Sequence, residues 1–307
     1  MDIFKQLKEA VGNNKLMEPI QRINQMAKTV DSFRSLLKDN KVSQSVKDMI
    51  NGLMTLIKTK PNINGINHYF NHLLLKLDPE NQPPVLKELL EVYHERWKNV
   101  DRKTAQVAYD LLALSEDEEI TFLLHGAEKS VTSLLEIMMV NQKKVNIYQT
   151  ASKPSDIGKE QAKKIVDIGY EVQFIEDYAV GAVLADVDYV LIGCELILHN
   201  DFVANAGTHT LLAAAQYYKR PVYMLADSRR LLNSKYFPQN VLNNMIGEGK
   251  IASKNIWKNP PEGVKINLYA KEQCPNYLIE KFIFEDSYST AAELKEMIDR
   301  VMVKKFF

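Results

Sequence analysis

Apolar residues recur at three- and four-residue steps through the first third of the chain. Ile20, Ile23, Val30 and Phe33 are examples, and this spacing places apolar side chains on one face of a helix. Prolines break the pattern at several points, but no run typical of a strand interrupts it. The sequence therefore predicts an all-helical N-terminal domain over residues 1–114.

The pattern changes after an acidic stretch at residues 115–119. Short apolar runs then alternate with helix-length amphipathic stretches such as residues 159–168. The runs are residues 120–124, 145–148, 172–175, 189–192 and 222–225. Such runs are typical of strands buried on both faces, and their alternation with helices indicates a parallel sheet. The prediction is an α/β chain in which the helical domain precedes a Rossmann-like, doubly wound sheet domain over residues 115–307.

Two later segments complete the predicted sheet domain. Residues 265–269 are expected to add material at a sheet edge, and residues 275–284 to close the domain. In doubly wound sheets, ligands bind beyond the carboxyl ends of the strands. We therefore expect the residues that follow each run to form any site.

The balance of charges limits the classes of function. Lysine plus arginine and aspartate plus glutamate each number 39, so no basic excess favours nucleic acid or a membrane surface as a partner. Only two cysteines occur, Cys194 and Cys274, and neither has the spacing of a zinc site, a haem attachment or a redox pair. This cysteine usage fits a reducing compartment.

The distribution of apolar and charged residues also bears on location. Charges occupy positions where a signal peptide would need an apolar run, and no stretch of ~18 uncharged apolar residues occurs. We expect a cytoplasmic protein that neither is secreted nor spans a membrane. No metal-ligand constellation is evident and no Gly-x-Gly-x-x-Gly fingerprint follows a strand run, so no metal or dinucleotide cofactor is predicted.

The most distinctive motif lies in the middle of the predicted sheet domain. Residues 177–181 (Asp-Tyr-Ala-Val-Gly) precede residues 188–195 (Asp-Tyr-Val-Leu-Ile-Gly-Cys-Glu), and a turn region follows over residues 200–208. This order resembles the initiation factor 2B α/β/δ family, in which an Asp-x-Ala segment precedes a strand that ends in Gly-Ala-Glu or Gly-Ala-Asp. An Asn-Gly turn and Asn-Lys-Ile-Gly-Thr then follow. The resemblance covers about residues 120–228.

The resemblance has implications for activity. Two branches of the family, ribose-1,5-bisphosphate isomerase and methylthioribose-1-phosphate isomerase, convert aldose phosphates to ketose phosphates, whereas the regulatory branch does not. The resemblance implies that the enzymes use a cysteine shortly after the first strand and an aspartate in Gly-Ala-Asp, because moving a proton between adjacent carbons needs an acid and a base. This chain has Gly126 and Glu195 at those positions, and the regulatory α-subunit also has Gly-Ala-Glu. We therefore assign no catalytic residue and keep only Glu195 and Asp177 as candidates.

The phosphate-binding pattern implied by the resemblance is altered as well. Glu128 stands where the family has serine, and Gly207 arrives one residue early, so the family's lysine is missing. A carboxylate repels a phosphate where helix-start amides would attract it. Lys129 or Lys153 could compensate. We expect an acidic cleft that binds sugar phosphates weakly.

The residues expected to line this cleft come from separate segments of the chain. They are His125, Gly126, Glu128, Lys129, Lys153, Asp177, Glu195, Asn205, Gly207 and Thr208. Each follows a predicted strand or opens the next helix, and parallel strands present such ends on one side of the sheet. Cys194 is expected to be a small buried residue and not a nucleophile.

Three functional hypotheses remain open. The leading one is a non-catalytic family member that acts through subunit assembly and protein contacts, and the alternative is an aldose–ketose isomerase for a sugar phosphate. The third is a ligand-sensing module for a less phosphorylated or cationic metabolite. The resemblance implies a homodimer formed through the C-terminal domain, with further subunits or an initiation-factor-like protein as candidate partners. Leu211, Leu212 and Ala213 also favour a buried helix at that interface.

Overall fold

The computed structural model describes residues 95–115, 118–233, 257–267 and 269–301. The chain divides into two compact units, and all described residues except 95–98 belong to the unit formed by Asn99–Ser234 and Asn243–Val301. The helical domain predicted over residues 1–114 lies mostly outside the described residues. Its last part, helix α6 (Val100–Leu112), belongs to the sheet-containing unit.

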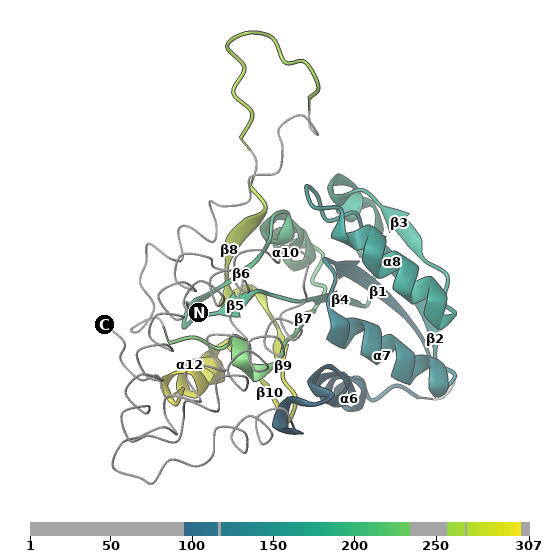
Figure 1. Cartoon of the computed structure of the whole chain (residues 1–307). Coiled ribbons are helices and arrows are strands. Elements are labelled where there is room, and N and C mark those ends of the chain that lie inside the picture. The colour runs from purple at the N-terminus through teal and green to yellow at the C-terminus, as the bar shows by residue number, and fades with distance from the viewer. Residues whose placement is uncertain (1–94, 116–117, 234–256, 268, 302–307) are drawn as a thin grey trace, which may run out of the picture. The chain divides into compact units, whose positions relative to one another are not determined.

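The core of this unit is a seven-stranded sheet with the order β10-β9-β7-β4-β1-β2-β3 (Figure 1). Its strands are β1 (Glu119–His125), β2 (Lys144–Thr150), β3 (Gln173–Ile175), β4 (Tyr189–Ile192), β7 (Val222–Leu225), β9 (Lys281–Ile283) and β10 (Tyr288–Ser289). All neighbouring pairs are parallel except β9 and β10. The five predicted apolar runs correspond to β1, β2, β3, β4 and β7, so the predicted parallel sheet is confirmed.

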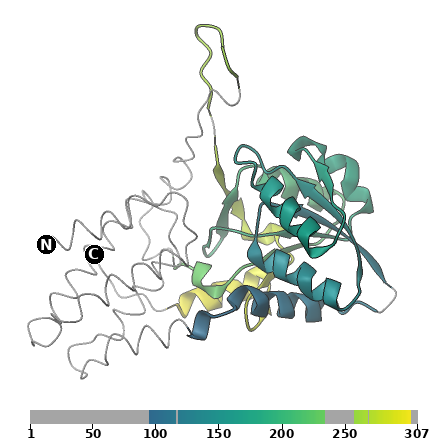
Figure 2. The same cartoon turned by 45° about the vertical axis from the view of Figure 1, so that its right-hand side comes forward.

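Helices cover both faces of the sheet (Figure 1, Figure 2). They are α6, α7 (Lys129–Val140), α8 (Ile157–Ile168), α9 (Val180–Val183), α10 (Thr208–Tyr217) and α12 (Ala291–Asp299). Phe122 and Leu124 of β1 pack in one apolar cluster with α6, α7 and α8, whereas Leu123 packs in the other with α9, α10 and α12. Because successive strand residues point to opposite faces, an uninterrupted apolar run is what a doubly covered strand needs.

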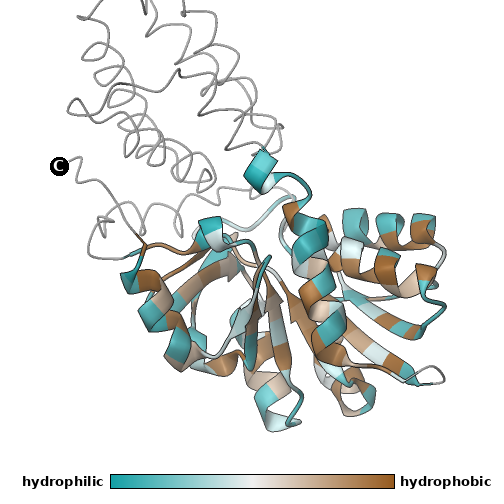
Figure 3. Cartoon of the chain, turned by 90° about the horizontal axis from the view of Figure 1, so that it is seen from below, coloured by the Kyte–Doolittle hydropathy of each residue, from teal (hydrophilic) through white to brown (hydrophobic). Residues whose placement is uncertain are grey.

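The hydropathy of the residues agrees with a sheet that is covered by helices on both faces. The central strands are largely brown in Figure 3, and the helices that flank them carry teal residues alongside brown ones. Among the described residues, no helix combines the length and the apolar character needed to cross a membrane.

A second, antiparallel sheet of three strands has the order β5-β6-β8. Its strands are β5 (Leu196–Ile197), β6 (Asp201–Asn205) and β8 (Lys271–Pro275). The prediction of sheet material at residues 265–269 is wrong, because the described residues there form no strand and β8 begins at Lys271. β8 pairs with β6, which the sequence analysis did not recognise as a strand.

The strand order places a topological switch beside β1. The chain proceeds from β1 outward through β2 to β3, then returns to β4 on the other side of β1. Crevices for ligands form where the strand order reverses in this way, beyond the carboxyl ends of the strands. The ends of β1 and β4 are therefore where a site is expected.

Candidate functional site

His125 is the last residue of β1 and is buried. Its Nδ1 lies 2.8 Å from Oγ1 of Thr150, at the end of β2, and 4.0 Å from Oδ1 of Asp177. Burial lowers the pKa of the imidazole, while Asp177 and the backbone of Ala206 act to raise it. Since burial prevails, the ring is neutral at pH 7.

Asp177 fixes the turn that follows β2. It lies in the 3₁₀ helix η2 (Asp177–Ala179), and its Oδ1 and Oδ2 accept the backbone N–H groups of Ser152 and Lys153 at 2.7 and 2.6 Å. The Ser152 hydroxyl in turn accepts the N–H of Gly126 at 2.7 Å. Both carboxylate oxygens of this candidate acid are thus engaged by backbone amides, which favours a role in holding the turn.

Two glycines allow separate segments to approach the end of β1. Gly126 and Gly207 have φ values of +87° and +94°, which L side chains rarely adopt. A Cβ atom at Gly126 would lie 3.0 Å from Nδ2 of Asn205, and one at Gly207 would lie 3.4 Å from Cε1 of His125. Thr208, which opens α10, donates its hydroxyl to the Asn205 carbonyl at 2.7 Å. The turn between β6 and α10 is therefore packed directly on His125 and Gly126.

Glu195, just after β4, forms an ion pair with Lys271. The Lys271 ammonium also donates to Oδ1 of Asn205 at 2.8 Å. Burial acts to raise the pKa of Glu195, but Lys271 and Arg230 together outweigh it and the net shift is downward. Glu195 is therefore ionised at neutral pH.

A second ion pair joins Glu128, which precedes α7, to Arg230. Oε1 of Glu128 lies 3.1 Å from Nη2 of Arg230, and Nε of Arg230 lies 3.8 Å from Oδ2 of Asp227. Burial raises the pKa of Glu128 to about 7, even though Arg230 acts to lower it. Glu128 also lies against the backbone after β4, because a Cβ at Gly193 would be 2.3 Å from its Oε2.

The structure brings most of the predicted site residues together. His125, Gly126, Asp177, Asn205, Gly207 and Thr208 form one contiguous group, and Glu195 joins it through Lys271. Glu128 is linked to the group by its charge. It acts to raise the pKa of the Cys194 thiol, and Glu195 acts to raise the pKa of Glu128. The two predicted lysines differ from this group: the half-exposed Lys153 ammonium pairs with Asp156 at 2.7 Å, and Lys129 is exposed.

Lys271 and Arg230 were missed by the sequence analysis, which expected an acidic cleft because the family's lysine is missing and named only Lys129 and Lys153 as cations that could compensate. Arg230 had a signal, because residues 227–230 (Asp-Ser-Arg-Arg) directly follow the predicted strand β7. Lys271 had none, since it reaches Asn205 through the pairing of β8 with β6. Glu128 and Glu195 are each paired with a cation, and the third acidic side chain of the site, Asp177, is held by backbone amides.

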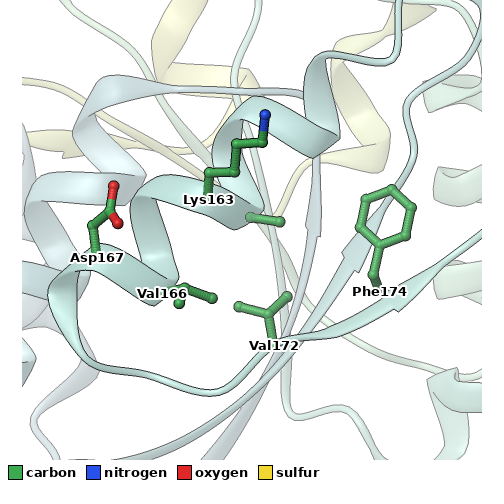
Figure 4. Close-up of a pocket in the computed structure, with 6 residues that line it drawn as sticks. Lys163, Val166, Asp167, Val172 and Phe174 are labelled. Carbon is green, nitrogen blue, oxygen red and sulfur yellow. The ribbon is translucent and has the colours of Figure 1, made fainter.

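Cys194 lies beside the site without a free thiolate, and a surface hollow lies apart from the site. Cys194 is buried, as predicted, and burial raises the pKa of its thiol well above the ordinary value. The hollow, of about 310 Å³, is lined by Ala162, Lys163, Val166, Asp167, Val172 and Phe174. Figure 4 shows its side chains on α8 and along the segment that enters β3. None of the predicted site residues lines this hollow.

Relatives of two functional kinds match this chain. A family model described as the initiation factor 2 subunit family matches residues 11–286. Translation initiation factor eIF2B subunit alpha of Dictyostelium discoideum is 27% identical over 155 residues, which cover 49% of this chain and 48% of the relative. The match thus spans about half the length of that subunit. Ribose 1,5-bisphosphate isomerase of Methanocaldococcus jannaschii is 22% identical over 291 residues, covering 93% of this chain and 91% of the relative.

Solved structures share the fold. The Pyrococcus horikoshii translation initiation factor eIF-2B has a TM-score of 0.68 at 15% identity, with 93% of this chain and 96% of that chain covered. The 5-methylthioribose 1-phosphate isomerase of the same organism also has a TM-score of 0.68, at 14% identity and with coverage of 96% and 87%. The family model matches most of the sequence, and the chain therefore belongs to the initiation factor 2 subunit family.

Proposed function

We propose that this protein is a non-catalytic member of the family that acts through assembly with other protein chains, with its sheet-edge site serving at most to bind a ligand. The observation that carries the proposal is Gly126. It stands where the resemblance to the isomerases implies a cysteine, and a Cβ there would meet the Asn205 amide at 3.0 Å on a backbone with φ +87°. A thiol would need both the side chain and the backbone to shift.

The state of Glu195 supports the same conclusion. The resemblance implies that the isomerases have an aspartate at this position and that this aspartate transfers a proton. Here the carboxylate is paired with Lys271, which brings the pKa below the ordinary value. A carboxylate with a lowered pKa is a weaker base, and general base catalysis is most efficient when the pKa lies near the working pH.

An isomerase activity assay tests the proposal. The purified chain is incubated with ribose-1,5-bisphosphate and with methylthioribose-1-phosphate, and ketose formation is followed by NMR, with a ribose-1,5-bisphosphate isomerase as the positive control. We expect no ketose from this chain. Turnover that is lost in Glu195→Gln would overturn the proposal.

The second candidate function is sugar-phosphate isomerisation. It is favoured by the match to ribose 1,5-bisphosphate isomerase over 91% of that enzyme, compared with about half of the eIF2B alpha subunit. In this chain the chemistry would rest on Glu195 with Asp177 or His125 instead of a thiol. The same assay decides between the two functions.

The partners form part of the proposal. Among the structural neighbours is a tetrameric eIF2B-beta2-delta2 complex of C. thermophilum, with a TM-score of 0.66 at 14% identity. We expect this chain to form a homodimer and to associate with further subunits or an initiation-factor-like protein. Native mass spectrometry after gentle purification would reveal such chains, and also any small metabolite retained at the sheet edge.

A further inference from the structure

Glu128 is placed at a helix start but does not cap the helix. It is the N-cap residue of α7, and its side chain accepts no hydrogen bond from the amides of the first turn. Serine, threonine, aspartate and asparagine are the side chains that commonly accept such a bond at this position. The carboxylate of Glu128 instead bonds Arg230, which comes from the 3₁₀ helix η4 (Ser228–Arg230) after β7.

The place that the Glu128 carboxylate occupies is enclosed. The side chains of Glu128 and Arg230 are 10% and 24% exposed. Oε2 of Glu128 fills the space in front of Gly193 so closely that a Cβ atom there would lie at 2.3 Å. Glu128 therefore fits where it is only because residue 193 is glycine.

The charged groups around Arg230 show that the Glu128 carboxylate is its close ion-pair partner. Asp227 is already bonded by Arg229, with Oδ1 and Oδ2 at 2.7 and 3.1 Å from the guanidinium nitrogens, and lies farther from Arg230 at 3.8 Å. Without Glu128, the partly buried Arg230 would keep Asp227 at 3.8 Å as its nearest carboxylate among the described residues, with Glu195 and Asp101 acting on it from farther away. A buried charge without a partner is costly, so Arg230 would then attract an external anion.

We propose that Glu128 is an internal anion, which occupies on Arg230 the place that an anionic group of a ligand would otherwise take. Glu128 thereby determines specificity: a ligand at the sheet edge cannot place an anionic group on Arg230, because that group would meet both the filled space and the carboxylate charge. The inference concerns the same site as the proposed function and rests on it only in assuming that this site binds a ligand.

The test uses sulfate, which stands for the anionic group and keeps its charge across neutral pH. In Glu128→Ser the serine caps α7 but leaves the space beside Arg230 open. Isothermal titration calorimetry at pH 8, above the pKa of about 7 of Glu128, and at constant ionic strength should show that Glu128→Ser binds sulfate about ten-fold or more tightly than the unmodified chain, as expected for charge-assisted hydrogen bonds. The matched control Glu128→Gln fills the same space, and the double variant Glu128→Ser/Arg230→Met lacks the cation, so neither should gain this affinity.

Each outcome bears on the proposal. A folded Glu128→Ser protein that binds sulfate no more tightly than the unmodified chain overturns it, and so does an equal gain in the double variant. If Glu128→Ser does not fold, Glu128→Ala tests the same step, because it also removes the carboxylate that bonds Arg230 and opens the same space, and it should likewise admit sulfate. Isomerase turnover by the unmodified chain would remove the proposed function and leave this test unaffected.

Discussion

Glu195 and Glu128, each paired with a cation at the sheet edge, have pKa values shifted in opposite directions. Glu195 has a lowered pKa because Lys271 bonds it directly, whereas burial raises the pKa of Glu128 to about 7 in spite of Arg230. Asp101, Asp227 and Glu195 add negative charge around Glu128 and contribute to its shift. The raised pKa of Glu128 therefore reflects burial and neighbouring negative charge, which together outweigh the effect of the Arg230 cation.

The raised pKa of Glu128 predicts a pH-dependent stability. Its carboxyl group binds a proton more tightly in the folded chain than in the unfolded one, where the pKa is near 4.5. The free energy of unfolding contributed by this group is thus largest below pH 4.5 and is lost as the pH rises to about 7. Urea unfolding at pH 5 and pH 8 should show that the stability of the unmodified chain relative to Glu128→Gln falls by about 1–3 kcal/mol.

The comparison with Glu128→Gln is needed because His125 titrates in the same range. Burial lowers its folded pKa from 6.5, so its contribution to stability increases as the pH rises to about 6.5, opposite in sign to that of Glu128. Both proteins contain His125, and its effect cancels in the difference. A difference in stability that stays constant between pH 5 and pH 8 would contradict the assignment.

Lys271 is expected to stabilise the site through Glu195. Lys271→Met should lower the free energy of unfolding by about 1–2 kcal/mol, because it leaves the half-buried carboxylate and Asn205 without their common donor. Chemical unfolding of Lys271→Met, Glu195→Gln and the double variant forms a cycle. The double variant should lose less stability than the two single changes summed. Strict additivity would show that the two side chains do not interact energetically.

At the level of single residues, the sequence predicted the positions of the site better than their partners. His125, Gly126, Asp177 and Glu195 could be located because each follows a recognisable apolar run, whereas Asn205 was located only through the resemblance to the family. Their hydrogen-bond partners depend on how distant segments pair. Arg230 and Lys271 are the cations that decide the charge of the site, and Lys271 lies on a strand that has no apolar run.

At the level of elements, the close packing of the first turn of α8 against the end of β2 requires a glycine at position 158. Gly158 donates its N–H to the Ala151 carbonyl at 3.2 Å, and a Cβ there would lie 1.8 Å from the backbone oxygen of Thr150. This close contact holds the first turn of α8 on the end of β2, next to the hydroxyl that bonds His125. The backbone at this joint has no space for a side chain.

Gly158→Ala should therefore destabilise the protein by roughly 2–4 kcal/mol, since a backbone oxygen cannot move aside as a flexible side chain can. Gly181→Ala in α9 is the matched control, because a Cβ there meets no atom within 4 Å. This control should be neutral or slightly stabilising. Thermal unfolding of both variants measures the difference, and equal midpoints would contradict the described packing.

The elements themselves could be predicted where one physical signal dominated. Buried parallel strands need continuous apolar runs, and five of them were identified in this way. β5 and β6 are two and five residues long and lie in a small antiparallel sheet, so they give no comparable run. On α10, Leu211 and Leu212 pack in the core of their own unit, and they no longer support a dimer interface.

For the whole molecule, the extent of the sheet-containing unit differs from the division made on sequence. Asn99 begins this unit, and Ala105, Ala108 and Leu112 of α6 pack in the same cluster as α7 and α8. The amphipathic spacing of α6 looks the same whether its partner is another helix or a sheet layer, so periodicity could not assign it. The helical domain predicted over the remaining N-terminal residues stays a prediction.

The expectation that this chain forms a homodimer rests on its family membership alone. Light scattering across a micromolar dilution series should give twice the chain mass of 35.2 kDa, as expected if this chain forms a homodimer. Glu128→Ser should give the same mass as the unmodified chain, because Glu128 is enclosed against Gly193 and Arg230 and presents little surface to a second chain. A change of mass in that variant would link the sheet-edge site to assembly. A mass of one chain at every concentration would contradict the homodimer and leave hetero-assembly as the route by which a non-catalytic member could act.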